Sequence, residues 1–117
     1  MGSNAVDTNL SIEIDRYVTI GEINALKTTL SASLVSNSTV VIQAKHVQTI
    51  DSAGLQLFVA FANTLKGLNS SLQWQDPSRE LLEAAELLGL AEALGLESRL
   101  EEEKEEEKEE DDLLPVF

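Results

Sequence analysis

Hydrophobic and polar residues follow two different strand patterns along the chain. Leu10, Ile12 and Ile14 alternate with polar neighbours, which is the period of a half-buried β-strand. Residues 39–44 form a β-branched run without alternation, which predicts a central strand covered on both faces, as parallel sheets require. A further short strand is indicated over residues 72–74.

The first helix is predicted by a capping signal followed by an apolar stripe. Thr19 and Glu22 have the spacing of a capping box, in which two side chains satisfy the free backbone amides at a helix start. A short strand is expected over residues 17–19, and the helix is expected to end near residues 36–38. The side chains expected on its buried stripe are Ile23, Leu26, Leu30 and Leu34.

Two more helices follow. The second starts at residues 51–52, where either the Asp51 or the Ser52 side chain can cap, and ends near residues 66–69. The third is predicted to start at residues 76–77, where an acidic capping residue precedes a proline, and to stop at Gly89. The side chains expected to point inward are Leu55, Phe58, Val59, Ala62 and Leu65 on the second helix, and Leu81, Leu82, Ala85 and Leu88 on the third.

Strands and helices therefore alternate along the chain. This order favours an α/β domain in which parallel strand pairs are joined by right-handed crossovers. We expect a small domain over residues 8–96, with about four strands in a mixed sheet and three to four helices, the last a short continuation over residues 90–96. Residues 97–117 are predicted to be an acidic low-complexity tail that ends in the apolar run 113–117.

The charge is concentrated in that tail. The net charge is −13. Residues 97–117 hold 11 acidic and 3 basic side chains, whereas residues 1–96 hold 10 and 5. Such a balance argues against binding to nucleic acid or to anionic lipid, because both need clustered Lys and Arg.

Several classes of site are disfavoured by composition. The chain has no cysteine and one histidine, His46, which is expected at the surface, so neither a metal nor a cofactor is predicted. No apolar run reaches the length of a membrane span, and the first residues lack a signal-peptide pattern, so a cytoplasmic protein without membrane insertion is expected. There is no catalytic motif, and an enzyme is not expected. Trp74 is expected in the core rather than at a partner surface.

The candidate site is the stretch 51–55, Asp-Ser-Ala-Gly-Leu, at the start of the second helix. It offers a carboxylate and a hydroxyl at an exposed helix end, and Gly54 permits a close approach of the backbone by the rest of the domain or by a partner. Ser52 either caps the helix or contacts a partner.

This stretch, preceded by a strand at residues 40–42 and followed by a helix, resembles the STAS family, which includes the bacterial anti-sigma factor antagonists. The segment 75–79 and the Leu-Leu-Gly-Leu helix end at residues 87–90 fit the last strand and helix of that family. The resemblance covers about residues 8–96. It implies a STAS-like domain without an active site, which docks to a protein partner through Asp51, Ser52, Ala53, Gly54 and Leu55.

The resemblance leaves two kinds of partner open. In the antagonists, a kinase phosphorylates a serine immediately before the motif glycine, and this chain has Ala53 there. Ser52 is then either a displaced phosphorylation site for an anti-sigma or chemotaxis-type kinase, or part of a constitutive docking surface. The hydroxyl-Ala-Gly-Leu order is also similar to STAS subunits that bind the ATPase of bacterial lipid-transport ABC systems. The sequence says nothing of the oligomeric state, and the apolar end 113–117 is either a free end or a docking peptide.

Overall fold

The computed structural model describes residues 8–97 and residue 99, so the predictions made for the tail lie outside the described residues. The elements, in chain order, are β1 (Thr8–Glu13), β2 (Tyr17–Val18), η2 (Ile20–Glu22), α1 (Ile23–Ser31), β3 (Ser38–Gln43), β4 (Thr49–Ile50), α2 (Ser52–Gly67), β5 (Ser71–Gln75), α3 (Arg79–Leu87) and α4 (Ala91–Leu94). None of these helices is long and apolar enough to cross a membrane.

The strands form a sheet of three and a pair of two. β3 lies between β1 and β5 and is parallel to both, with Ile42 opposite Ile12 on one side and Trp74 on the other. β2 and β4 form a separate parallel pair that follows the ends of β1 and β3. The prediction of a small α/β domain is confirmed; each strand pairing described is parallel. The sequence pattern predicts no strand at β4, because two residues are too few to show a period.

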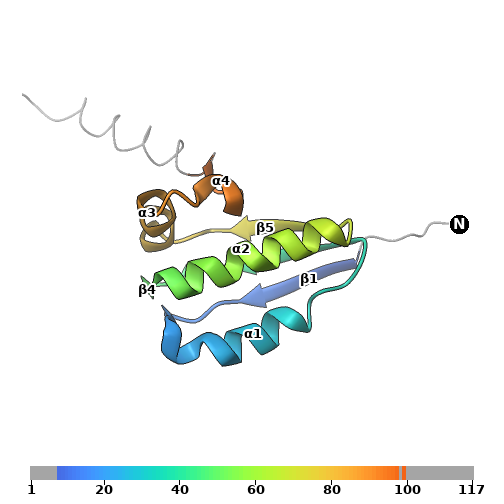
Figure 1. Cartoon of the computed structure of the whole chain (residues 1–117), viewed down its shortest axis with the longest axis horizontal. Helices are drawn as coiled ribbons and strands as arrows, with labels where there is room; N and C mark the ends of the chain where they lie inside the picture. The colour runs from blue at the N-terminus through green and yellow to red at the C-terminus, as the bar shows by residue number, and fades with distance from the viewer. Residues whose placement is uncertain (1–7, 98, 100–117) are drawn as a thin grey trace, which may run out of the picture.

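The helices are distributed across the width of the sheet. α2 lies over the middle of the sheet and runs along the strands, with α1 on the β1 side and α3 and α4 on the β5 side (Figure 1). The core between these layers includes Val40, Ile42, Leu55, Phe58 and Leu81, none of which is exposed to solvent. The sequence order strand, helix, strand, helix thus places the start of α2 at one end of the molecule, beside the short β4 (Figure 1).

The prediction that β3 is covered on both faces is wrong. Val40 and Ile42 face the helices and are fully buried, whereas the alternate residues of the strand, Val41 among them, are half-buried. Polar neighbours surround Val41 on this open face. The side-chain amide of Gln43 donates a hydrogen bond to the Ser11 hydroxyl at 3.2 Å. Because these polar groups satisfy one another at the surface, the face needs no helix over it.

The helix start predicted at residues 19–22 is confirmed. A carboxylate oxygen of Glu22 accepts hydrogen bonds from the Thr19 hydroxyl at 2.6 Å and from the Thr19 backbone amide at 3.3 Å. The predicted end near residues 36–38 is wrong, since α1 ends at Ser31. Leu34 lies beyond the helix but is half-buried against the core. Its apolar side chain therefore continued the helical pattern past the true end of α1.

The cap predicted for α3 is displaced by two residues. The hydroxyl of Ser78 accepts from the amide of Leu81 at 3.1 Å and caps the helix, whereas Asp76 takes a left-handed backbone conformation with φ 49°. A tertiary contact explains why Ser78 rather than Asp76 is the cap, because the backbone amide of Ser78 donates to the carbonyl of Ala44 at 3.2 Å. Leu88, expected inward, is exposed, while Gly89 ends the helix as predicted.

Most of the predicted core is confirmed. Trp74 is buried, its ring meets the Phe58 ring edge to face at a centroid distance of 5.3 Å, and its indole N–H donates to the carbonyl of Leu94 at 2.8 Å. On α2, Phe61 is buried although the sequence pattern did not select it, whereas Val59 and Ala62 are only half-buried. His46 is exposed, as expected.

Candidate docking site at the start of α2

Asp51 caps α2 with one of its carboxylate oxygens. Its Oδ1 accepts a hydrogen bond from the amide of Gly54 at 2.9 Å, and its backbone is extended, as the residue before a helix normally is. The sequence allowed either Asp51 or Ser52 as the cap. Asp51 is the cap, and the Ser52 side chain is not needed for it, because Ser52 is the first helical residue.

The other carboxylate oxygen of Asp51 ties α2 to the start of η2. Oδ2 accepts from the amide of Ile20 at 2.9 Å, and the Asp51 amide donates to the carbonyl of Val18 at 3.2 Å. The hydrogen bond from Gly54, followed by that from Ile20, lowers the pKa of Asp51, because both stabilise the charged carboxylate. One side chain thus fixes two helix starts relative to each other.

Gly54 is required by the close packing of α2 on β2. A Cβ at this position would collide with the carbonyl oxygen of Val18, lie 2.8 Å from Val18 Cγ1 and lie 3.1 Å from Ile50 Cγ1. Of the two uses the sequence left open for this glycine, packing inside the domain is therefore the one that the geometry demands.

The five motif residues differ in how far a partner can reach them. Ser52 is exposed, Asp51 and Ala53 are half-buried, and Gly54 and Leu55 are buried, Leu55 completely. Gly54 and Leu55 therefore hold the helix start in place from within the domain. The hydroxyl of Ser52 is the part of the motif most open to contact.

Exposed apolar side chains near this helix start were not found from the sequence. Ile20, whose amide is bonded to Asp51, is 72% exposed, and Tyr17 on β2 is 55% exposed. The signal was present, since Ile20 lies between the capping residues Thr19 and Glu22 and off the stripe of α1. We call Ile20, Asp51, Ser52 and Ala53 the docking surface.

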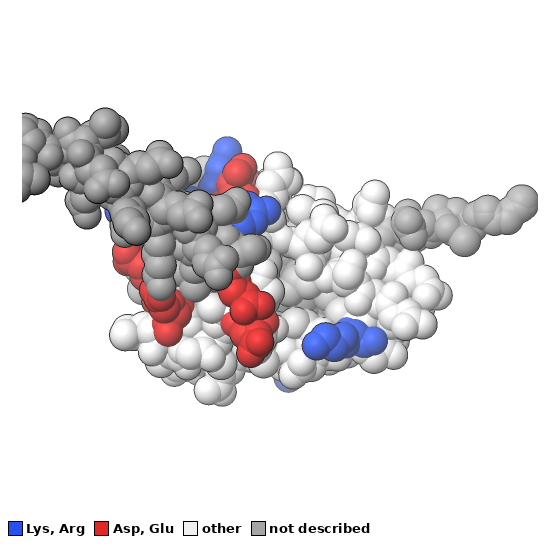
Figure 2. Space-filling model, turned by 90° about the horizontal axis from the view of Figure 1, so that it is seen from above, with Lys and Arg blue, Asp and Glu red and all other residues white. Residues whose placement is uncertain are grey.

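The neighbouring surface is acidic. α3 packs against β4 at the same end of the molecule and exposes Glu80, Glu83 and Glu86. Figure 2 shows acidic side chains on this part of the surface, with basic side chains beside some of them. Leu87, at the end of α3, is 85% exposed beside these carboxylates. A partner that reaches from the docking surface to α3 therefore meets negative charge.

The arrangement lacks the contacts of a catalytic or metal site in the part of the chain that the structure describes. No hydrogen bond joins Ser52, Asp51 and His46 there, and both carboxylate oxygens of Asp51 accept from backbone amides. Residues 8–97 and 99 contain no group of three or more His, Asp or Glu side chains placed to hold a metal ion. The geometry is that of a rigid helix start with an exposed hydroxyl.

The sequence of residues 3–99 matches the family model described as "Mlab, STAS domain". The chain belongs to the STAS domain family. STAS domains are in general non-enzymatic domains that mediate regulation and protein–protein interaction. No curated protein sequence matches the chain.

A solved structure supports the fold. The chain is similar to the crystal structure of a sulfate transporter family protein from Wolinella succinogenes, with a TM-score of 0.61 and 20% sequence identity. The similarity covers 80% of this chain and 79% of that one. At this identity the likeness bears on the fold, and the STAS-like architecture expected from the sequence is thereby confirmed.

Proposed function

We propose that this protein is a non-enzymatic STAS-domain regulatory protein that docks to a protein partner through the docking surface. The observation that carries the proposal is the exposed Ser52, presented on a helix start that Asp51 and Gly54 fix rigidly. A preformed site binds without the entropy cost of ordering, and exposed Ile20 adds apolar area beside the hydroxyl.

Constitutive docking is favoured over a phosphorylation switch. Ala53 takes the position before Gly54 where the anti-sigma factor antagonists carry the phosphorylated serine, and its half-buried methyl group cannot accept a phosphate. The hydroxyl-Ala-Gly-Leu order resembles STAS subunits that bind the ATPase of a lipid-transport ABC system. We therefore propose an ATPase of that class as the partner and an accessory, cytoplasmic role for this chain.

The exposure of Ser52 supports a second candidate, an antagonist-like switch. Ser52 lies at the N-terminus of α2, where the helix dipole favours the negative charge of a phosphate. A kinase of the anti-sigma or chemotaxis type could reach this hydroxyl, and the added charge of about −1.5 to −2 would change what the docking surface binds.

One experiment separates the two candidates. Purified protein is mixed with the ATPase of a lipid-transport ABC system from the same source, and separately with a kinase of the anti-sigma type, each with and without ATP. The affinity is measured by calorimetry and the mass of the chain by mass spectrometry. We expect binding to the ATPase and an unmodified Ser52.

A phosphate on Ser52 that abolishes kinase binding would instead establish the switch. Binding to neither protein would contradict both candidate partners while leaving the fold unaffected.

A further inference from the structure

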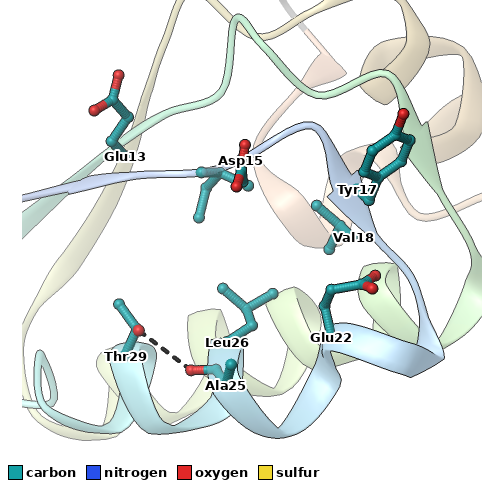
Figure 3. Close-up of a pocket in the computed structure, with 9 residues that line it drawn as sticks. Glu13, Asp15, Tyr17, Val18, Glu22, Ala25, Leu26 and Thr29 are labelled. Carbon is teal, nitrogen blue, oxygen red and sulfur yellow. Dashed lines mark hydrogen bonds between the residues drawn. The ribbon is translucent and has the colours of Figure 1, made fainter.

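A pocket of about 260 Å³ lies beside the docking surface, between α1 and the segment that joins β1 to β2. Its apolar part includes Val18, which is buried, and Leu26, which is half-buried. Figure 3 shows Leu26 rising from α1 toward the opposite wall, from which Val18 points toward the helix. Tyr17 forms one end of the pocket and is 55% exposed.

Three exposed carboxylates, those of Glu13, Asp15 and Glu22, line the same pocket, and no basic side chain lines it. Within residues 8–97 and 99, none of the three forms an ion pair. One oxygen of Asp15 accepts from the Arg16 amide at 2.8 Å, and one oxygen of Glu22 is used by Thr19. The described contacts therefore leave acceptor capacity on all three carboxylates.

The size and the chemistry of the pocket fit one long cationic side chain. Sites for drug-sized ligands span roughly 300–1,000 Å³, so this pocket is small for such a ligand. Lysine and arginine lay their methylene groups on apolar surface and keep the charged end among polar groups. The apolar part at Leu26 suits the methylene groups, the carboxylates suit the charge, and the Tyr17 ring offers a cation–π contact.

The pocket lies next to the docking surface, and the buried Val18 links the two inside the domain. This residue lines the pocket, and its carbonyl accepts from the amide of Asp51. Glu22, on another wall, follows Ile20 of the docking surface by two residues. A partner bound over Ile20 and Ser52 therefore has the pocket within reach of its next side chains.

We propose that this pocket receives an arginine or lysine side chain of the protein partner and so contributes to the choice of partner. Arginine is favoured, because its planar guanidinium can bond two carboxylate oxygens and stack on Tyr17. The assignment of the side chain to a docking partner rests on the proposed function, whereas the binding chemistry of the pocket does not.

The test uses the full ¹⁵N-labelled chain and two small probes, acetyl-arginine methylamide and its uncharged isostere acetyl-citrulline methylamide. Backbone amide shifts are followed by NMR during titration. We expect saturable shifts with the arginine probe at residues 13–18 and 22–29, with a millimolar dissociation constant, and no saturable shift with citrulline.

Two pocket variants and one control sharpen the result. Glu13→Gln and Asp15→Asn should each raise the dissociation constant of the arginine probe about two- to fivefold, which is the range of an exposed ion pair. Glu83→Gln, which removes the same charge from α3, should leave the constant unchanged. Absence of saturation, equal binding of citrulline, or an equal effect of Glu83→Gln would overturn the proposal. Because no partner protein is present, this result is independent of whether the docking surface is correctly assigned.

Discussion

Asp51 is the residue on which the geometry of the site depends. Its two carboxylate oxygens hold the first turn of α2 and the first residue of η2, at 2.9 Å each. A capping serine such as Ser78 satisfies one helix, whereas Asp51 satisfies two. Replacing Asp51 by alanine leaves the amides of both helix starts without this acceptor.

We predict that Asp51→Ala destabilises the fold more than Ser78→Ala, which should cost about 1 kcal/mol as a single lost cap. The pKa of Asp51 is lowered in the folded state, so its contribution is fully present above the unfolded pKa, near 3.9, and is lost as the pH falls through the folded value. Urea unfolding of both variants between pH 3 and 7 measures this. The difference between wild type and Asp51→Ala should shrink below about pH 4, and the Ser78→Ala difference should stay constant. A difference for Asp51→Ala that does not change with pH would refute the charged-cap account.

Gly54 offers a second test at the residue scale, with a matched control in the same helix. Gly54→Ala forces a Cβ into Val18 and should destabilise by about 1–3 kcal/mol, the usual cost of overpacking. In Gly67→Ala the added Cβ has no neighbouring atom within 4 Å. This variant should be neutral or stabilised by up to about 1 kcal/mol, because alanine restricts the unfolded chain. Thermal unfolding of the two variants and of the wild type measures both changes in stability. Equal effects would show that the close packing at Gly54 is not needed.

Among the elements, α2 was the easiest to predict and α3 the hardest at its start. Residues 51–67 combine a capping residue with an apolar stripe, so two independent signals agree. Asp76 and Ser78 are both good capping residues, and the local pattern does not distinguish them. The contact of Ser78 with Ala44, 34 residues away along the chain, makes the choice, and such a contact is not visible in a local pattern.

Trp74 joins three elements, since its ring on β5 meets Phe58 of α2 and its N–H bonds the carbonyl of Leu94 in α4. Trp74→Phe should leave that carbonyl without this donor and cost about 1–3 kcal/mol, beyond the effect of the smaller ring. Amide hydrogen exchange should rise first in residues 90–97 and stay unchanged in α1. Equal acceleration in both segments would mean that the Trp74–Leu94 bond does not hold α4 locally.

At the scale of the whole molecule, the fold class could be predicted because strand and helix periods alternate along the chain. The site could be predicted only in part. The sequence selected residues 51–55 as candidates, but their division into exposed Ser52 and buried Leu55 depends on how α2 packs on β2. The pocket beside α1 was not predicted, because residues of β1, η2 and α1 line it jointly only through the chain turn between β1 and η2.

Among the residues that the structure describes, the buried core lies within residues 12–96. We therefore predict that truncation after Arg99, whose guanidinium donates to the Trp74 carbonyl at 2.9 Å, changes the free energy of unfolding by no more than about 0.5 kcal/mol. Thermal unfolding of the truncated and full chains at equal ionic strength measures this. A loss of several kcal/mol would show that residues 100–117 belong to the folded domain.

The central claim, docking at the start of α2, is tested most directly by the affinity of two serine-to-glutamate variants for the ATPase partner. Ser52→Glu places charge and bulk on the docking surface while the helix dipole favours glutamate at this end, so the variant stays folded. Ser36→Glu makes the same change in the exposed loop after α1. This loop lies at the opposite end of α2, because the amide of the neighbouring Asn37 donates to the carbonyl of Leu68 just beyond that helix. We predict that Ser52→Glu weakens binding at least about tenfold, or 1.4 kcal/mol, and that Ser36→Glu leaves it unchanged. Equal affinities of the two variants would contradict the account.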